Sequence, residues 1–224
     1  MSTVEFAEAT RVATNPLAGL ERRCLIWMAG RLPRWVTSDG LTALALAAMA
    51  ITGISYARGP GHPGALLIAI VGLALNWFGD SLDGTVARVR RQQRPRYGFY
   101  VDHVVDCLGA FLLLGGLALS TYMTPAIATG LLVVFLMLSI ESYLATYTLG
   151  TFHISYWKFS PTELRILLAA GNVALFYKPV VKLFGAQYRL FDVGGAAGIV
   201  GMGLMLIVSV AQHTVALYRA ETNR

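Results

Sequence analysis

The sequence predicts an all-α integral membrane protein, in which six transmembrane helices follow an N-terminal amphipathic helix at the membrane surface. Two observations predict this fold. Hydrophobic residues make up 56% of the 224 residues and charged residues only 13%, a balance that is unusual in soluble domains. The mean hydropathy is +0.60, and several apolar stretches reach the roughly 20 helical residues that cross a hydrocarbon core.

The first expected element precedes the spans. Asn15–Leu32 carries apolar residues at helical spacing, with arginines between them that can reach lipid phosphates. We expect a helix lying along the membrane there, and a solvated linker is the alternative. We expect no cleavable signal peptide, because the first 40 residues hold five arginines and no apolar core of the right length.

The six spans are separated by turn or charge signals, such as Arg58–Gly61 and the basic run Arg88–Arg96. We expect them at Leu41–Ala57, Gly64–Val86, Phe99–Thr121, Pro125–Leu149, Pro161–Phe184 and Phe191–Tyr218. Residues 1–40 then form a cytoplasmic or interfacial N-terminal segment. Residues 41–224 form the six-helix transmembrane domain that carries the candidate site.

The basic residues lie mostly on one side of this layout. With the N-terminus in the cytoplasm, 14 of the 18 lysines and arginines fall in cytoplasmic segments, the side that these residues favour. We therefore expect both termini in the cytoplasm. The net charge of +6 then reflects topology and attraction to anionic lipids, and no soluble domain with a basic face is expected that would bind nucleic acid.

Four aspartates lie within 27 residues near the cytoplasmic ends of the second and third spans. Asp80 and Asp83 are three residues apart, and Asp102 and Asp106 are four apart, so each pair shares a helix face. The two helices form an antiparallel hairpin, which brings both pairs to the same depth. Carboxylates in spans are costly and normally mark an ion site or a catalytic site.

Four facing carboxylates cannot all stay ionised without cations between them. Their hard oxygen atoms suit Mg²⁺ or Mn²⁺, and two such ions could clamp a pyrophosphate and stabilise a leaving phosphate. A carboxylate that is not fully engaged by metal can take a proton from an attacking hydroxyl, and Asp106 is the candidate. A buried ion network or a proton path is the alternative.

Three neighbouring residues fit the same site. Gly84 and Gly98 lie where a side chain would crowd a substrate against the helices. Arg88, at the membrane surface, could pair with a phosphate or with one of the aspartates.

These residues resemble the signature of the CDP-alcohol phosphotransferase (CDP-alcohol phosphatidyltransferase) family. That signature reads D-x-x-D-G-x-x-A-R, a spacer of about eight residues, and G-x-x-x-D-x-x-x-D. The chain has Asp80-Ser-Leu-Asp83-Gly84-Thr-Val-Ala87-Arg88 and then Gly98-Phe-Tyr-Val-Asp102-His-Val-Val-Asp106. All eight specified residues are present, and the spacer has nine residues.

The resemblance implies an enzyme that transfers the phosphoryl-alcohol group of a CDP-linked alcohol to a second alcohol and releases CMP. It implies two divalent ions, Mg²⁺ or Mn²⁺, held by Asp80, Asp83 and Asp102, with Asp106 as general base and a possible metal ligand. It also implies a homodimer. The donor-binding residues that it implies are Asp80, Asp83, Gly84, Ala87, Arg88 and Gly98.

One departure from the family concerns the start of the first span. Relatives often have P-N-x-L-T there, whereas this chain has Ser38-Asp39-Gly40-Leu41-Thr42. Asp39 therefore replaces an asparagine that, by the resemblance, would lie near the nucleotide. The other role for Asp39 is to cap the helix, in which Asp and Asn are nearly equivalent.

The acceptor half of the site has two candidates. Glu141, an isolated carboxylate in the fourth span, either contacts a substrate or packs against a neighbouring helix. Arg165, one turn inside the fifth span, either binds an acceptor phosphate or carboxylate or pairs with Glu141 or an aspartate.

The leading hypothesis is therefore phospholipid synthesis from CDP-diacylglycerol and a small alcohol or phospho-alcohol, with the active site at the cytoplasmic side of a bacterial inner membrane. A soluble CDP-alcohol donor with a lipid acceptor is a close variant. A divalent-cation transporter would not need the A-R and G-x-x-x-D elements. An intramembrane prenyltransferase would need more spans and a different aspartate layout.

Overall fold

The computed structural model describes residues 18–59, 62, 64–149, 161–183 and 185–222. The described elements, in chain order, are α1 (Ala18–Arg31), α2 (Ser38–Arg58), α3 (Gly64–Val89), α4 (Pro95–Ala118), α5 (Pro125–Leu149), α6 (Pro161–Tyr177), β1 (Val180–Leu183), β2 (Ala186–Arg189) and α7 (Leu190–Thr222).

Five helices, α2, α3, α4, α5 and α7, are long and apolar enough to cross a membrane, and α6 contains a shorter apolar helix. The predicted helical membrane fold is confirmed. The expected extent of the fifth span is wrong, because α6 ends at Tyr177. Pro179 cannot continue a helix and disfavours helical backbone at the residue before it. The chain then forms the antiparallel hairpin β1–β2.

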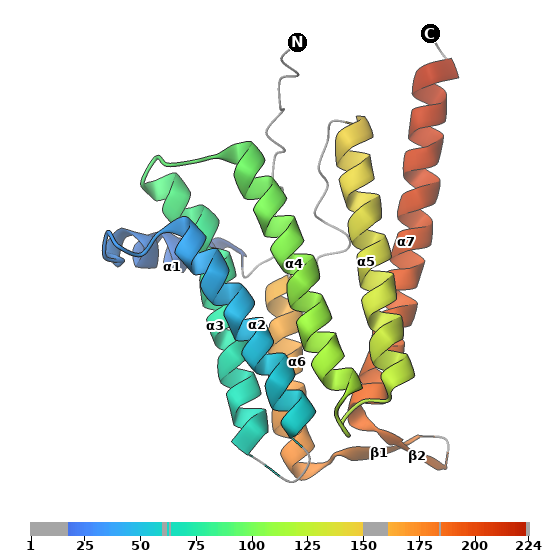
Figure 1. Ribbon diagram of the computed structural model, residues 1–224. Coiled ribbons are helices and arrows are strands. Elements are labelled where there is room, and N and C mark those ends of the chain that lie inside the picture. The colour runs from blue at the N-terminus through green and yellow to red at the C-terminus, as the bar shows by residue number, and fades with distance from the viewer. Residues whose placement is uncertain (1–17, 60–61, 63, 150–160, 184, 223–224) are drawn as a thin grey trace.

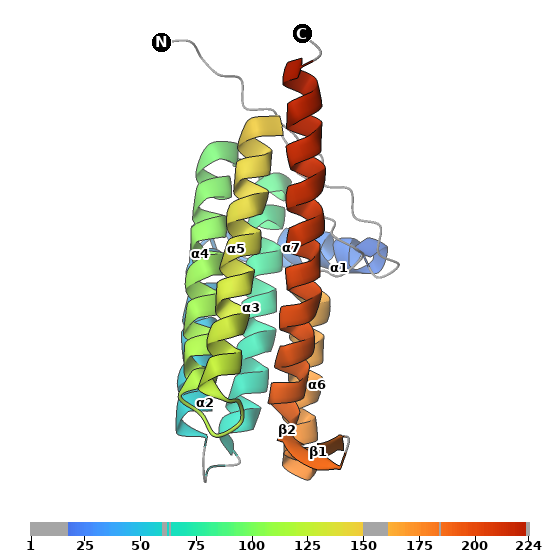
Figure 2. The ribbon, with the colours of Figure 1, turned by 90° about the vertical axis from the view of Figure 1, so that its right-hand side faces the viewer.

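The long helices run roughly side by side (Figures 1 and 2). Helix α2 packs against α3 and α4, α5 packs against α4 and α7, and α6 packs mainly against α3. The hairpin β1–β2 lies at one end of the bundle, and the turn between α3 and α4 lies at the other, the end at which α7 also terminates (Figure 1).

Glycines bring α2 and α4 into near backbone contact. A Cβ added at Gly116 would lie 2.1 Å from the carbonyl oxygen of Gly53, and one added at Gly53 would lie 2.1 Å from that of Leu112. Small residues of this kind allow close packing of membrane helices. Helices α2 and α4 are therefore packed closely together at this point.

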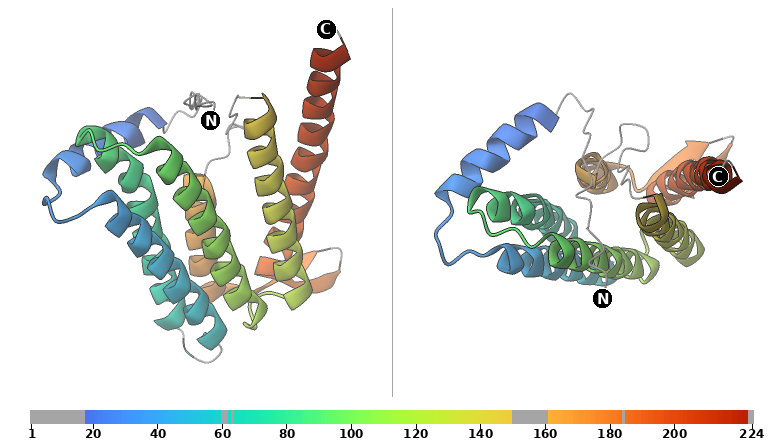
Figure 3. Two further views of the ribbon diagram at one scale, coloured as in Figure 1. Left: turned by 45° about the horizontal axis from the view of Figure 1, so that its top comes forward. Right: turned by 90° about the horizontal axis from the view of Figure 1, so that it is seen from above.

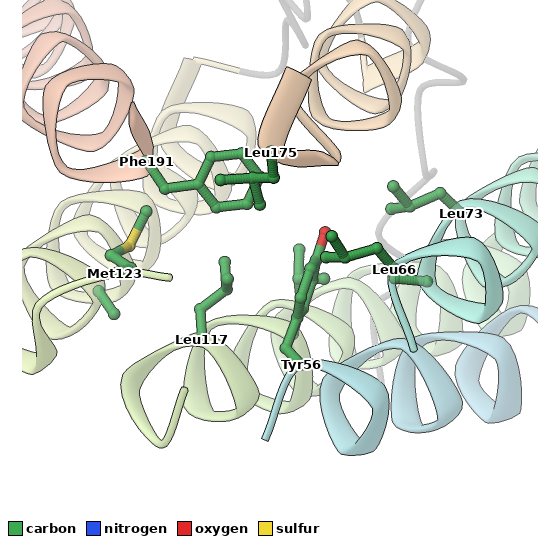
Figure 4. Packing of buried hydrophobic residues seen from close by; sticks show 10 residues of the cluster. Tyr56, Leu66, Leu73, Leu117, Met123, Leu175 and Phe191 are labelled. Atoms are coloured by element: carbon green, nitrogen blue, oxygen red, sulfur yellow. The ribbon is translucent and has the colours of Figure 1, made fainter. Parts of the chain in front are cut away.

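A hydrophobic cluster closes the hairpin end of the bundle (Figure 4). It joins α2, α3, α4, α6 and α7 through side chains near their ends, among them Tyr56, Leu66, Leu117, Leu175 and Phe191. The buried Tyr56 hydroxyl accepts a 2.7 Å hydrogen bond from the Asn172 side chain. The helices therefore converge at this end, and the aspartates lie toward the opposite end.

Helix α1 crosses the end of α3 at a steep angle (Figure 3). Its buried Ala29 belongs to a cluster with Leu82 and Val86 of α3. The Arg90 guanidinium donates to the carbonyl oxygens of Leu32 and Pro33 at 2.9 Å each. A helix is present before the first span over Ala18–Arg31, while its place along a membrane surface stays a prediction. The start of the expected segment, at residues 15–17, lies outside the described residues.

Candidate active site

Helices α3 and α4 are joined by a tight turn that places the two aspartate pairs together. Helix α3 ends with Arg91 in the left-handed conformation, at φ 55°. The Gln92 amide donates to the Ala87 carbonyl at 2.8 Å, and the Arg91 amide donates to the Arg88 carbonyl at 3.1 Å. This is a Schellman ending, usually made by glycine. Helix α4 begins four residues later, at Pro95.

The four aspartates, Asp80, Asp83, Asp102 and Asp106, form what we call the aspartate cluster. The charges of the other three act on Asp106, so the hairpin brings both pairs within electrostatic range, as the spacing predicts. Asp83 is nearly buried, Asp80 and Asp102 are half-buried, and Asp106 is exposed. The aspartate cluster therefore combines a buried carboxylate, Asp83, with a solvent-accessible one, Asp106.

Arg165 reaches the cluster from α6. Its Nη2 donates to Asp80 Oδ2 at 2.7 Å, and the two side chains are only 12% and 24% exposed. The Arg165 charge also acts on Asp106. Of the two sequence-based hypotheses for Arg165, the structure shows the ion pair with an aspartate. This pair brings a third helix into the site.

Thr42 of α2 holds Asp83. Its hydroxyl donates to Asp83 Oδ2 at 2.7 Å, while Asp83 Oδ1 accepts a 2.5 Å hydrogen bond from the Gly84 amide. Both carboxylate oxygens are therefore oriented by the protein. Thr42 is not among the predicted site residues, although it belongs to the part of the first-span pattern that this chain retains.

Helix α5 supports the face of α4 between Asp102 and Asp106. The Tyr143 ring packs edge-on against His103, with ring centroids 4.7 Å apart. The Tyr143 hydroxyl lies 3.7 Å from Cys107 Sγ. These contacts flank both aspartates of α4 and fix the rotation of that helix.

The oxygen-rich donor set of the aspartate cluster fits divalent cations in its chemistry. In the part of the chain that the structure describes, no three acidic, histidine or cysteine side chains converge on one metal position. Asp80 is hydrogen-bonded to Arg165 and Asp83 to Thr42. An ion held by Asp80 would compete directly with the Arg165 guanidinium.

The glycines of the motif are not required for packing. A Cβ added at Gly84 or Gly98 would meet no protein atom within 4 Å. Glycine also weakens a helix relative to alanine. Neither packing nor helix stability therefore explains glycine at these two positions. Nearby, Ala87 is half-buried, and the exposed Arg88 donates to the Thr85 hydroxyl at 3.2 Å.

The expected capping role of Asp39 is wrong. Thr37 is the N-cap of α2, and its hydroxyl oxygen accepts from the Gly40 amide at 3.1 Å. Asp39 instead forms an ion pair at 2.5 Å with Arg94, the residue before α4, and both side chains are about half exposed at 51% and 53%. The pair ties the starts of α2 and α4 together. It borders a hollow lined by Thr37, Ser38, Asp39, Gln92, Gln93 and Arg94.

Glu141 lies in the interface between α5 and α7. Its Oε1 is 2.6 Å from Nδ1 of His213, and the side chains are 10% and 21% exposed for Glu141 and His213 respectively. His213 is not among the predicted site residues, because its partner lies 72 residues away in the sequence. The pairing favours the packing hypothesis for Glu141.

Comparison with known families identifies the class of protein. The family model for CDP-alcohol phosphatidyltransferase matches residues 33–214, which is most of the chain. The chain belongs to this family. A search of curated proteins gives no significant match. A CDP-alcohol phosphatidyltransferase is a transferase of substituted phosphate groups, so the aspartate cluster lies in a membrane enzyme of phospholipid biosynthesis.

Proposed function

We propose that this enzyme transfers a phosphatidyl group from CDP-diacylglycerol to a small polar alcohol or phospho-alcohol and releases CMP. The observation that carries the proposal is the Asp80–Arg165 pair, which joins a predicted metal ligand to a cation suited to an anionic acceptor. A donor with two lipid tails would present its pyrophosphate at the level of this site.

The donor half consists of the aspartate cluster and the residues around it. We assign Asp80, Asp83 and Asp102, with a share from Asp106, to two Mg²⁺ or Mn²⁺ ions. Bound there, the ions would neutralise the pyrophosphate and activate its phosphorus. The open backbone at Gly84 and Gly98 allows close approach of the nucleotide, next to Ala87 and Arg88.

Asp106 is our candidate for the general base. Its side chain is exposed, so an acceptor hydroxyl can reach it and transfer its proton to a carboxylate oxygen. The deprotonated oxygen forms the new bond to the phosphorus of the phosphatidyl group, while the bond from that phosphorus to the CMP oxygen breaks. CMP takes the electron pair of that bond and leaves.

Arg165 is our candidate for acceptor recognition. When Asp80 turns to a metal ion, the guanidinium loses its carboxylate partner and can bind an acceptor phosphate or carboxylate with two parallel hydrogen bonds. Glu141 stays a weaker candidate, since its pair with His213 indicates a supporting role between α5 and α7.

The membrane arrangement follows from the same proposal. We propose that α6 is the fifth of six spans, that α1 lies at the cytoplasmic surface, and that both termini and the site face the cytoplasm. The 14 basic residues predicted on that side support this orientation. We also propose that the protein forms a homodimer in a bacterial inner membrane. Residues 1–40 would form the N-terminal segment, and residues 41–224 the transmembrane domain.

The test is CMP release by purified protein in lipid nanodiscs. CDP-diacylglycerol, Mg²⁺ or Mn²⁺ and a panel of acceptor alcohols are supplied, and the lipid product is identified by mass. We expect CMP release that requires both the metal ion and one added alcohol. Release of CMP from a soluble CDP-alcohol with diacylglycerol, and none from CDP-diacylglycerol, would show that the close variant is correct.

A further inference from the structure

Glu21 of α1 accepts hydrogen bonds from two other helices. Its Oε1 receives the Trp77 indole N–H of α3 at 3.0 Å and the Thr162 hydroxyl of α6 at 2.9 Å. These donors lie 56 and 141 residues away in the sequence. A carboxylate oxygen has two lone pairs, so Oε1 can accept both hydrogen bonds at once.

The two donors flank the Asp80–Arg165 pair. Trp77 lies three residues before Asp80 on α3, and Thr162 lies three residues before Arg165 on α6. Residues three apart are neighbours on a helix surface. The two helices are therefore joined twice within about one turn, directly through the ion pair and again through Glu21.

Helix α6 is shorter than the five helices that are long enough to cross a membrane, so its position depends more on such links. It has 17 residues and packs mainly against α3. Its far end is fixed by Leu175 in the hydrophobic cluster. Toward the aspartates, Thr162 and Arg165 make polar contacts among the described residues, and both contacts are directed at this junction.

Helix α1 is itself fixed on α3. Ala29 packs in the cluster with Leu82 and Val86, and Arg90 holds the carbonyls that follow α1. Glu21 is half-buried near the opposite end of α1. A helix anchored in this way can set the position of a neighbour.

We infer that Glu21 is a positioning residue that sets α6 against α3, through Trp77 and Thr162, and so holds Arg165 at the aspartate cluster. The acceptor half of the site then depends on the surface helix α1. The kinetic part of this inference rests on the proposed function, and the structural part does not.

The structural part is tested by hydrogen–deuterium exchange of α6 in nanodiscs. Glu21→Ala removes both hydrogen bonds, whereas Glu21→Gln keeps a side-chain oxygen that accepts them. We expect faster exchange in residues 164–172 for Glu21→Ala and wild-type exchange for Glu21→Gln. The control is Glu221→Ala, which removes an exposed carboxylate at the end of α7. Unchanged exchange in Glu21→Ala would overturn the inference.

The kinetic part is tested with a double-mutant cycle. We expect Glu21→Ala to raise the acceptor KM about tenfold, on the scale of a lost hydrogen bond to a charged group, with a much smaller effect on the donor KM. In an Arg165→Ala background the same substitution should add little, since Glu21 acts through Arg165.

Equal effects of Glu21→Ala in both backgrounds would overturn the link to Arg165. If the wild-type protein transfers nothing from any CDP-alcohol, the proposed function fails, and the exchange experiment still decides whether Glu21 holds α6.

Discussion

Arg165 Nη2 of α6 lies 2.7 Å from Asp80 Oδ2 of α3, so a guanidinium neutralises one of the carboxylates assigned to metal. The same guanidinium acts on Asp106. In the proposed function, Arg165 and a divalent ion are alternative partners of Asp80. The proposed acceptor side and metal side of the site would then be linked through this contact.

The first prediction concerns this competition. Arg165→Ala removes a positive charge beside the metal position, so Mn²⁺ should bind about tenfold more tightly, given the size of charge interactions at a few ångströms. Mn²⁺ titration followed by electron paramagnetic resonance measures this directly. Arg165→Lys, which keeps the charge, is the control and should bind Mn²⁺ like the wild type. Weaker Mn²⁺ binding by Arg165→Ala would contradict the competition.

The second prediction concerns Asp106. Asp106→Asn removes the proton acceptor, so the rate of CMP release should fall by about 10²–10⁴, the usual contribution of general acid–base catalysis. Folding and nucleotide binding should persist, as judged by thermal unfolding and by CDP-alcohol binding.

The control for Asp106 is the same substitution at the other end of the bundle. Asp192 accepts 2.6 Å hydrogen bonds from the Thr124 amide and hydroxyl, so Asp192→Asn should lower the unfolding temperature and leave turnover nearly unchanged. Near-normal turnover of Asp106→Asn would reject Asp106 as the base.

The third prediction separates two kinds of glycine. Gly84→Ala adds a methyl group in open space, so stability should stay level or rise by about 0.5–1 kcal/mol, while the donor KM rises. Gly116→Ala forces a Cβ against the Gly53 carbonyl and should destabilise the protein by about 1–3 kcal/mol. Thermal unfolding and CMP release distinguish the two. An unchanged donor KM in Gly84→Ala would argue against nucleotide contact there.

The fourth prediction concerns Glu141 and His213. Because the pair is largely buried, Glu141→Gln should destabilise the protein by about 1–3 kcal/mol. We expect the acceptor KM to stay unchanged. His213→Gln should have a similar effect, and the double variant should be less than additive. A raised acceptor KM at unchanged stability would instead give Glu141 a role in substrate binding.

The hairpin of α3 and α4 was the most predictable part of the fold. Its aspartate spacings are local, and a helix places residues three or four apart on one face whatever surrounds it. Gly84 and Gly98 followed from the same local reasoning. The partners of the site residues were harder to predict from the sequence, because Thr42, Glu21 and His213 meet their partners only through tertiary packing.

The end of α6 is set by Pro179, a signal that was outweighed in the prediction by the hydrophobicity of the following residues. The stretch after Tyr177 is apolar enough to extend a span, yet Pro179 stops the helix. Gly185, at φ +83°, makes the turn between the strands. Paired strand residues then share faces, so that Val181 pairs with Tyr188 and Lys182 with Gln187. One face of the hairpin is apolar, and the other carries Lys182, Gln187 and Arg189 together with Val180.

Asp39 illustrates a different limit. Asp is a good N-cap, but Thr37 lies two residues earlier and takes that position. Asp39 is then free to meet Arg94. When two suitable capping residues lie close together, the sequence alone does not decide which one caps the helix. Here the contact of Asp39 with Arg94 accompanies capping by Thr37.

The close crossing of Gly53 and Gly116 also determines where the bundle is able to open. Two backbones in direct contact leave no layer of side chains that could slide or repack. Helices α2 and α4 therefore behave as a fixed wall, and α3 is packed against the same α2. If the bundle widens for a substrate, we therefore expect the widening on the side of the short α6, where the Asp80–Arg165 pair and Glu21 would have to release, and not between α2 and α4.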